Sequence, residues 1–238
     1  MRANREYLRD KFHRDGYCVI ENIVDPHLLS ASIPEIIAWW LDYYPSDTPE
    51  VVGSVVVDET FSYRSFIDYT HIRSRELGTN GTALAYAFLR THDSDENPRT
   101  DDPIRDLLRS QFEDISYITG QEVTGFYESF LSKYEQGCFL STHSDEFESP
   151  SPNLAFVLGL TGGWCNHWGG LTIIEGKDPL AATALFPNFN SLVVFKIPVW
   201  HMVSEVNNAA PYSRLAFSGW FYSAKGMPHL PQSFWNVP

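Results

Sequence analysis

Two histidines and an aspartate in the second half of the chain have the residue types and the spacing of a metal centre. His143 and Asp145 form a His-x-Asp pair, and His201 follows after a long strand-rich stretch. Imidazole nitrogens and a carboxylate oxygen together suit divalent first-row transition metals. Three such ligands on one side of an ion leave coordination positions open, and a two-His-one-carboxylate set is typical of non-haem Fe(II) sites.

The spacing also indicates how the backbone brings these ligands together. Successive residues of a strand point to opposite faces, so His143 and Asp145 are expected to project the same way. His201 is far away in the sequence and must come from another strand. A jelly roll makes such distant strands neighbours, and three ligands from two strands then share one face of the metal.

Arg214 begins the stretch Arg-Leu-Ala-Phe-Ser-Gly-Trp-Phe, which we expect to form the last major strand with Arg214 and Ser218 on one face. An arginine that points into an apolar barrel is costly without an anion. A carboxylate of a small diacid meets this need by bidentate hydrogen bonding, and Ser218 can donate a further hydrogen bond. An internal acid such as Glu205 is the alternative partner.

Length and composition limit the classes of protein to consider. A chain of 238 residues that is 43% hydrophobic fits one domain with a sizeable core. The net charge of −13 argues against a nucleic-acid binder. Three cysteines without paired spacing, a polar start and the lack of a long apolar run predict a cytoplasmic protein without a signal peptide or membrane span.

The pattern of apolar and turn residues predicts a mainly β domain over 1–238, with a helix-rich N-terminal support (1–122) and a β core that carries the metal site (123–225). Short runs of β-branched and aromatic residues separated by turns are typical of an antiparallel sandwich or jelly roll. Helices packed on one sheet would leave the other face for the site. We expect helices over 6–15, 25–41 with a boundary or kink at Pro34, 81–90 and 103–117, and strands over 17–24, 124–134, 154–160, 170–175, 191–197, 202–206 and 214–222.

Five sequence elements in order resemble the prolyl-4-hydroxylase-like branch of the Fe(II)/2-oxoglutarate-dependent dioxygenases. They are Tyr134-x-x-Gly137-x-x-Leu140-x-x-His143-x-Asp145, Gly169-Gly170-Leu171-x-Ile173, Phe186-Pro187-x-Phe189-Asn190-x-Leu192-Val193-Val194-Phe195, His201-x-Val203-x-Glu205-Val206, and the stretch from Arg214 to Phe221. The resemblance covers over a third of the chain.

The resemblance implies a double-stranded β-helix that holds Fe(II) through His143, Asp145 and His201. It implies that Arg214 binds the distal carboxylate of 2-oxoglutarate, helped by Tyr134 and Ser218, with O2 as co-substrate and ascorbate as an optional reductant. The expected reaction is hydroxylation with release of succinate and CO2. Halogenating relatives have a small residue in place of the carboxylate, so Asp145 favours hydroxylation.

The substrate and two rival functions stay open at this point. Relatives act on protein side chains, free amino acids and tethered intermediates, and the compact chain favours an amino-acid-like or peptidyl substrate. One rival is a zinc hydrolase with the same ligands, and the other is a non-catalytic jelly-roll binding module. Either a substrate-binding role or a solvated or packing role fits several residues, namely Arg64, Arg73, Arg75, Glu146, Glu148 and the Trp164–Trp168 loop. A second co-substrate tyrosine found in some relatives is replaced around Gly159.

Overall fold

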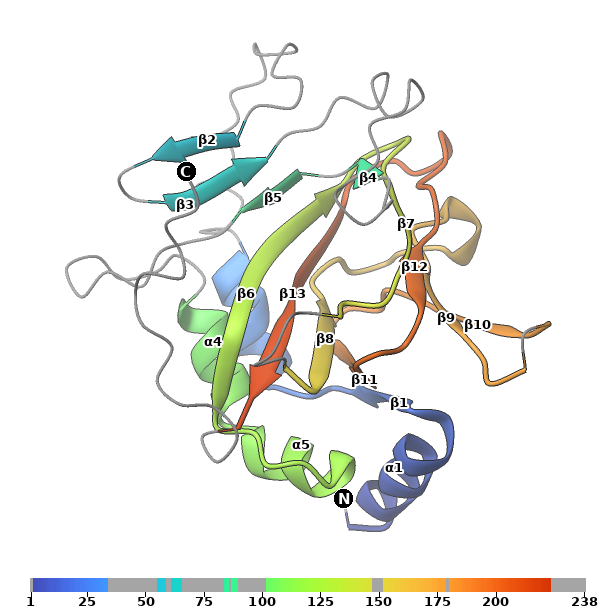
Figure 1. Cartoon of the computed structure of the whole chain (residues 1–238). Coiled ribbons are helices and arrows are strands. Elements are labelled where there is room, and N and C mark those ends of the chain that lie inside the picture. Colours follow the sequence, from blue (N-terminus) through green and yellow to red (C-terminus); the bar gives the residue numbers. More distant parts are fainter. Residues whose placement is uncertain are drawn as a thin grey trace.

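The structure is a computed structural model, and it describes residues 2–33, 55–58, 61–65, 84–85, 87–89, 102–146, 152–178 and 180–223 (Figure 1). Its helices are α1 (Arg2–Asp15), a helix over 26–33, α4 (Asp102–Arg109), α5 (Phe112–Thr119) and the short 3-10 helix η1 (Asn166–Trp168).

The described strands form two sheets that face each other (Figure 1). The larger sheet has the order β1-β11-β8-β13-β6-β5-β3-β2, and the smaller has the order β10-β9-β12-β7-β4. Every strand pair is antiparallel, so the predicted jelly-roll architecture is confirmed. The strands are β1 (Tyr17–Glu21), β2 (Val55–Asp58), β3 (Phe61–Ser65), β4 (Leu84–Ala85), β5 (Ala87–Leu89), β6 (Gly125–Tyr134), β7 (Phe139–His143), β8 (Leu154–Gly159), β9 (Thr172–Glu175), β10 (Ala182–Leu185), β11 (Ser191–Lys196), β12 (His201–Val203) and β13 (Arg214–Tyr222).

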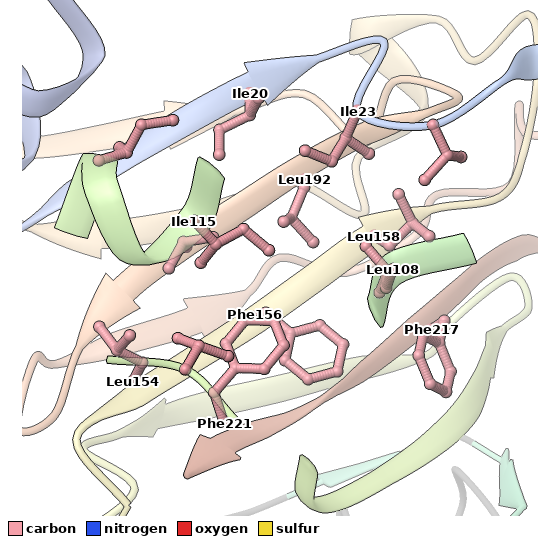
Figure 2. Packing of buried hydrophobic residues seen from close by; sticks show 14 of the residues in the cluster. Ile20, Ile23, Leu108, Ile115, Leu154, Phe156, Leu158, Leu192, Phe217 and Phe221 are labelled. Atoms are coloured by element: carbon pink, nitrogen blue, oxygen red, sulfur yellow. The ribbon is translucent and has the colours of Figure 1, made fainter. Parts of the chain in front are cut away.

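Alternation along the central strands divides the core into an outer and an inner layer. Leu192 of β11 and Phe156 of β8 belong to a cluster with Ile115 of α5 and Leu108 of α4 on the outer face of the larger sheet (Figure 2). The next residue of β11, Val193, belongs instead to an inner cluster with Ile174 of the smaller sheet. The helices therefore cover the outer face, as predicted, and the space between the sheets is left for the site.

The N-terminal part supplies strands to both sheets as well as helices. β1 pairs along its whole length with β11, from Tyr17 opposite Phe195 to Glu21 opposite Ser191. β5, β3 and β2 continue the larger sheet beyond β6, while β4 pairs with β7 of the smaller sheet. The described strands before residue 123 are thus built into the two sheets.

Two of the expected helices were wrong in part. The predicted helix over 81–90 contains strands β4 and β5 instead. Its residues, rich in alanine and leucine, are good helix formers, but pairing with β6 and β7 outweighs this weak preference. The predicted helix over 103–117 is two helices, α4 and α5, separated at 110–111.

All three cysteines are free thiols, in agreement with their unpaired spacing. Burial raises the pKa of Cys18 to about 12 and that of Cys138 to about 11, so both are protonated core thiols. Within the described ranges, none of the helices has the length and apolar character that a membrane crossing requires.

Gly159 at the end of β8 tests the packing of the sheet against the 187–190 turn. A Cβ at this position would lie 2.1 Å from the backbone oxygen of Asn188, and Asn190 donates its N–H to the Gly159 carbonyl. We expect Gly159→Ala to lower the free energy of unfolding by about 1–3 kcal/mol, as overpacking of a rigid site does. Urea denaturation measures the change. Gly162→Ala is the matched control, because its Cβ meets nothing within 4 Å; equal losses in both variants would contradict the packing described.

Candidate metal centre

The pairing of β7 with β12 places the two histidines beside each other. His143 is the last residue of β7 and lies directly opposite His201, the first residue of β12. Directly opposed residues of an antiparallel pair share a face of the sheet. The imidazole centroids are accordingly 4.1 Å apart.

Asp145 completes the group from beyond the end of β7. Its Oδ1 lies 3.3 Å from Nε2 of His143, and its Oδ2 lies 3.4 Å from Nε2 of His201. One ligand atom from each of the three residues lies within 4.8 Å of the others. The predicted convergence is therefore present, but its expected cause was wrong. Asp145 has a φ of 56° and lies outside the strand, so a left-handed residue, not strand alternation, turns its carboxylate towards the histidines.

Backbone carbonyls fix the orientation of both imidazole rings. Nδ1 of His143 lies 2.9 Å from the carbonyl oxygen of Ser141, and Nδ1 of His201 lies 2.8 Å from that of Val199. A carbonyl only accepts, so each Nδ1 carries the proton and donates. Each neutral ring then directs the lone pair of Nε2 towards the centre, which is the usual arrangement of a metal-bound histidine.

Burial is the largest influence on the pKa of each of the three groups. It lowers the pKa of His201 below its ordinary value. In His143, burial is more than offset by the hydrogen bond and charge of Asp145, and the pKa is raised. Burial also opposes ionisation of Asp145, but the two histidines and Trp220 outweigh it and lower the pKa of the carboxyl. The centre therefore offers an ionised carboxylate beside two imidazoles.

Arg214 is a buried cation without an acidic partner in the described part of the chain. Its side chain is 1% exposed and Nε has no hydrogen-bond partner. Nη2 donates to Oγ1 of Thr172 at 3.3 Å, and the guanidinium lies 4.9 Å from the ring centroid of Tyr134, which is opposite it on β6. Burial lowers the pKa of Arg214. Glu205, the alternative partner, is exposed and forms no ion pair with Arg214, so that alternative was wrong.

The register of the smaller sheet gives the separation between Arg214 and the metal ligands. Thr172, which Arg214 contacts, is two residues along β9 from Ile174, and Ile174 is opposite His201. Two residues of a strand span roughly 7 Å. A short dicarboxylate can therefore bind the centre at one end and Arg214 at the other.

A glycine and a tryptophan hold the side chain of Arg214 in place. Gly170 has a φ of 64°, and a Cβ there would lie 3.1 Å from Cδ of Arg214 and 3.3 Å from Cζ2 of Trp164. Trp164 is itself buried, and its Nε1 donates to the carbonyl of Gly169. Its ring packs edge to face against Trp168. Trp164 thus lies beside the same glycine as the stem of Arg214, and Trp168 packs on Trp164.

Sequence reasoning missed two polar contacts of the site. Nε1 of Trp220 donates to Oδ2 of Asp145 at 3.1 Å, and Thr172 is the hydroxyl that accepts from Arg214. Trp220 could have been found, because it shares a strand face with Arg214. Thr172 had no signal, since its role depends on which strands become neighbours.

The remaining candidates are less closely tied to the centre. Ser218 lies on β13 between Arg214 and Trp220, opposite Val157 and Phe130. Glu146 is exposed. Gly159 has no room for a side chain, because a Cβ there would meet the backbone of Asn188. Arg64 lies on β3, whereas Arg73, Arg75 and Glu148 lie outside the described residues.

Part of the chain matches a known protein family. Residues 129–222 match the family model described as the 2OG-Fe(II) oxygenase superfamily. This segment contains His143, Asp145, His201 and Arg214. No curated protein matched the sequence.

Solved structures of the same architecture include hydroxylases and an epimerase. A prolyl-4-hydroxylase from Pseudomonas putida is 18% identical with a TM-score of 0.56, over 91% of this chain and 97% of that one. A prolyl hydroxylase from Trichoplax adhaerens, in complex with a hypoxia inducible factor oxygen degradation domain peptide, is 16% identical with a TM-score of 0.63, over 94% and 91%. The non-heme alpha ketoglutarate dependent epimerase SnoN from nogalamycin biosynthesis is 14% identical with a TM-score of 0.62, over 100% and 90%.

The matched segment therefore resembles 2OG-Fe(II) oxygenases, enzymes that use Fe(II), 2-oxoglutarate and O2. The residues present fit these groups. Two imidazoles and a carboxylate form the donor set of a non-haem iron site. The buried guanidinium of Arg214 offers an unpaired N–H for a carboxylate of the co-substrate.

Thr172 provides a test of the anion site that leaves the metal ligands intact. Thr172→Val keeps the shape of the side chain but removes the oxygen that accepts from Arg214. We expect 2-oxoglutarate to bind roughly 2–10-fold more weakly, the usual effect of one hydrogen bond, with unchanged metal affinity. Calorimetric titration of the metal-loaded protein under anaerobic conditions measures both constants. Thr183→Val on the exposed strand β10 is the control; the same weakening in this variant would contradict a specific role of Thr172.

Proposed function

We propose that the protein hydroxylates an unactivated C–H bond of an amino-acid-like or peptidyl substrate. In this reaction 2-oxoglutarate is decarboxylated to succinate and CO2. One oxygen atom of O2 enters succinate, and the other enters the C–H bond of the substrate. The observation that carries the proposal is the position of Arg214. Its guanidinium is buried without an acidic partner in the described part of the chain, and a short dicarboxylate could span the distance from it to His143, Asp145 and His201.

Each site residue has a distinct role in the proposal. His143, Asp145 and His201 would hold Fe(II), and the bound iron supplies the activation of O2. Arg214 binds the distal carboxylate of 2-oxoglutarate, and Tyr134 and Thr172 orient its guanidinium. Ser218 is proposed as a further donor to the co-substrate, because it lies on the same strand face as Arg214.

The choice of hydroxylation and of a peptide-like substrate has separate support. One similar structure is a prolyl hydroxylase with a bound peptide, but another is an epimerase, so the fold alone does not set the reaction. Asp145 occupies the position of a carboxylate ligand, and this leaves no vacancy for a halide. Hydroxylation is therefore preferred to halogenation.

The proposal treats residues 1–238 as a single domain in the cytoplasm. Pairing of β1 with β11 and of β4 with β7 supports one domain, because the N-terminal part completes both sheets. The three free cysteines support a reducing compartment.

The visible spectrum of the anaerobic complex tests the co-substrate site. With Fe(II) and 2-oxoglutarate, the wild type should show the weak charge-transfer band of the chelate. Arg214→Ala should need roughly 10–100-fold more 2-oxoglutarate for half of the band, because a charge-assisted pair is lost. Arg109→Ala on the exposed face of α4 is the matched control and should titrate as the wild type does. A wild type without the band, but with hydrolase activity after zinc loading, would favour the rival zinc hydrolase.

Replacement of the carboxylate ligand tests the reaction itself. A screen of amino acids and peptides for succinate release first identifies a substrate. Asp145→Gly should then abolish the mass gain of one oxygen, because the ion loses an anionic ligand, and added chloride should enter the vacant position. Mass spectrometry of the product measures the gain of oxygen, and a gain of chlorine in its place would report chloride at the vacant position. Glu146→Gly, one residue on and exposed, should hydroxylate normally; full hydroxylation by Asp145→Gly would refute the ligand assignment.

A further inference from the structure

We infer that Trp220 is a positioning residue that holds the carboxylate of Asp145 so that it binds the metal through one oxygen. The inference rests on the proposed function, because it assigns a role around the same ion. It concerns a residue of the larger sheet that lies outside the predicted ligand set. Its basis is the hydrogen bond from Nε1 of Trp220 to Oδ2 of Asp145 at 3.1 Å.

Asp145 needs such support because the sheet does not fix it. The ladder between β7 and β12 ends at His143 and His201, so it positions both imidazoles. Asp145 follows the strand in a left-handed conformation that non-glycine residues adopt rarely. Its backbone therefore takes no part in the pairing that orients the other two ligands.

Metal binding removes the alternative partners of the carboxylate. In the described part of the chain, the side-chain contacts of Asp145 are with His143, His201 and Trp220. Both Nδ1 atoms donate to backbone carbonyls, so both Nε2 lone pairs are given to the ion when it binds. Neither imidazole can then donate to Asp145. The indole N–H is the donor that persists.

Trp220 is well suited to this task because its own position is fixed. Its strand, β13, pairs with β6 on one side and with β8 on the other. Its ring packs against Phe130, with centroids 5.8 Å apart, and against the inner hydrophobic cluster that contains Phe195. An indole N–H is a donor only, so it hydrogen-bonds to the carboxylate and does not compete for the ion.

The consequence for the centre is a defined number of open coordination positions. Trp220 donates to Oδ2, so Oδ1, the oxygen nearer to His143, would be the oxygen without a competing donor and would hold the ion. A carboxylate that swings to bind through both oxygens would take a position that 2-oxoglutarate or O2 requires. Trp220 thereby links Asp145, which follows β7 of the smaller sheet, to the larger sheet.

Binding of Co(II) alone tests the inference without turnover. Trp220→Phe keeps an aromatic ring but removes the N–H. We expect it to bind Co(II) about 10–100-fold more weakly than the wild type, as loss of a partner behind a metal ligand usually does. Its visible Co(II) spectrum should also change, because the carboxylate is free to bind through both oxygens. Trp168→Phe is the matched control, since Trp168 lies in the Trp164 cluster, and it should match the wild type in both measurements.

The outcomes separate this inference from the proposed function. A wild type that fails to bind Co(II) would overturn both. A wild type that binds normally, with Trp220→Phe equal to Trp168→Phe in affinity and spectrum, would overturn the role of Trp220 alone. If Trp220→Phe does not fold, NMR spectra of the indole N–H groups of the wild type test the role of Trp220 instead. One of the seven should shift on addition of Zn(II) and exchange slowly with solvent, and no such resonance would overturn the inference.

Discussion

The antiparallel contact between β7 and β12 is the interaction on which the site depends. It puts His143 directly opposite His201, although more than fifty residues separate them in the chain. Each strand is short, and β12 is held on its other side by β9. The two histidine ligands therefore belong to the middle of the smaller sheet, where the neighbouring strands fix their backbones before any ion binds.

The free-energy cost of burying Arg214 is the second constraint on the structure of the site. A guanidinium that leaves water needs compensation, and here the described protein supplies only Thr172, the face of Tyr134 and close packing. Under the proposed function, a carboxylate of the co-substrate supplies the missing partner. The stem of Arg214 also explains Gly170, since it occupies the space that a larger residue would need. The proposed anion site would then account for a burial that costs stability.

The sequence was most informative where a residue type is tied to one kind of chemistry. The spacing or the strand position of four residues made a purely structural role hard to explain, so they could be selected as site candidates: His143, Asp145, His201 and Arg214. The run of β-branched and aromatic residues over 191–197 likewise predicted a strand, which is β11.

What could not be predicted depends on the tertiary arrangement. The left-handed backbone of Asp145 follows no alternation rule, so the correct grouping was expected for the wrong reason. Thr172 acquires its role only when β9 faces β13 across the barrel, and no local pattern marks this. The segment over 84–89 has the composition of a helix, yet its partners β6 and β7 make it two strands.

The pairing of β1 with β11 delays completion of the larger sheet during folding. Tyr17 pairs with Phe195, so β1 obtains its backbone partners from a segment that is remote from it in the sequence. Pairings between such remote segments are slow to form, because a long loop must close first. Until β1 arrives, β11 has a strand partner on one side, β8, and an open edge on the other. This edge of the larger sheet is closed only when the two remote segments meet.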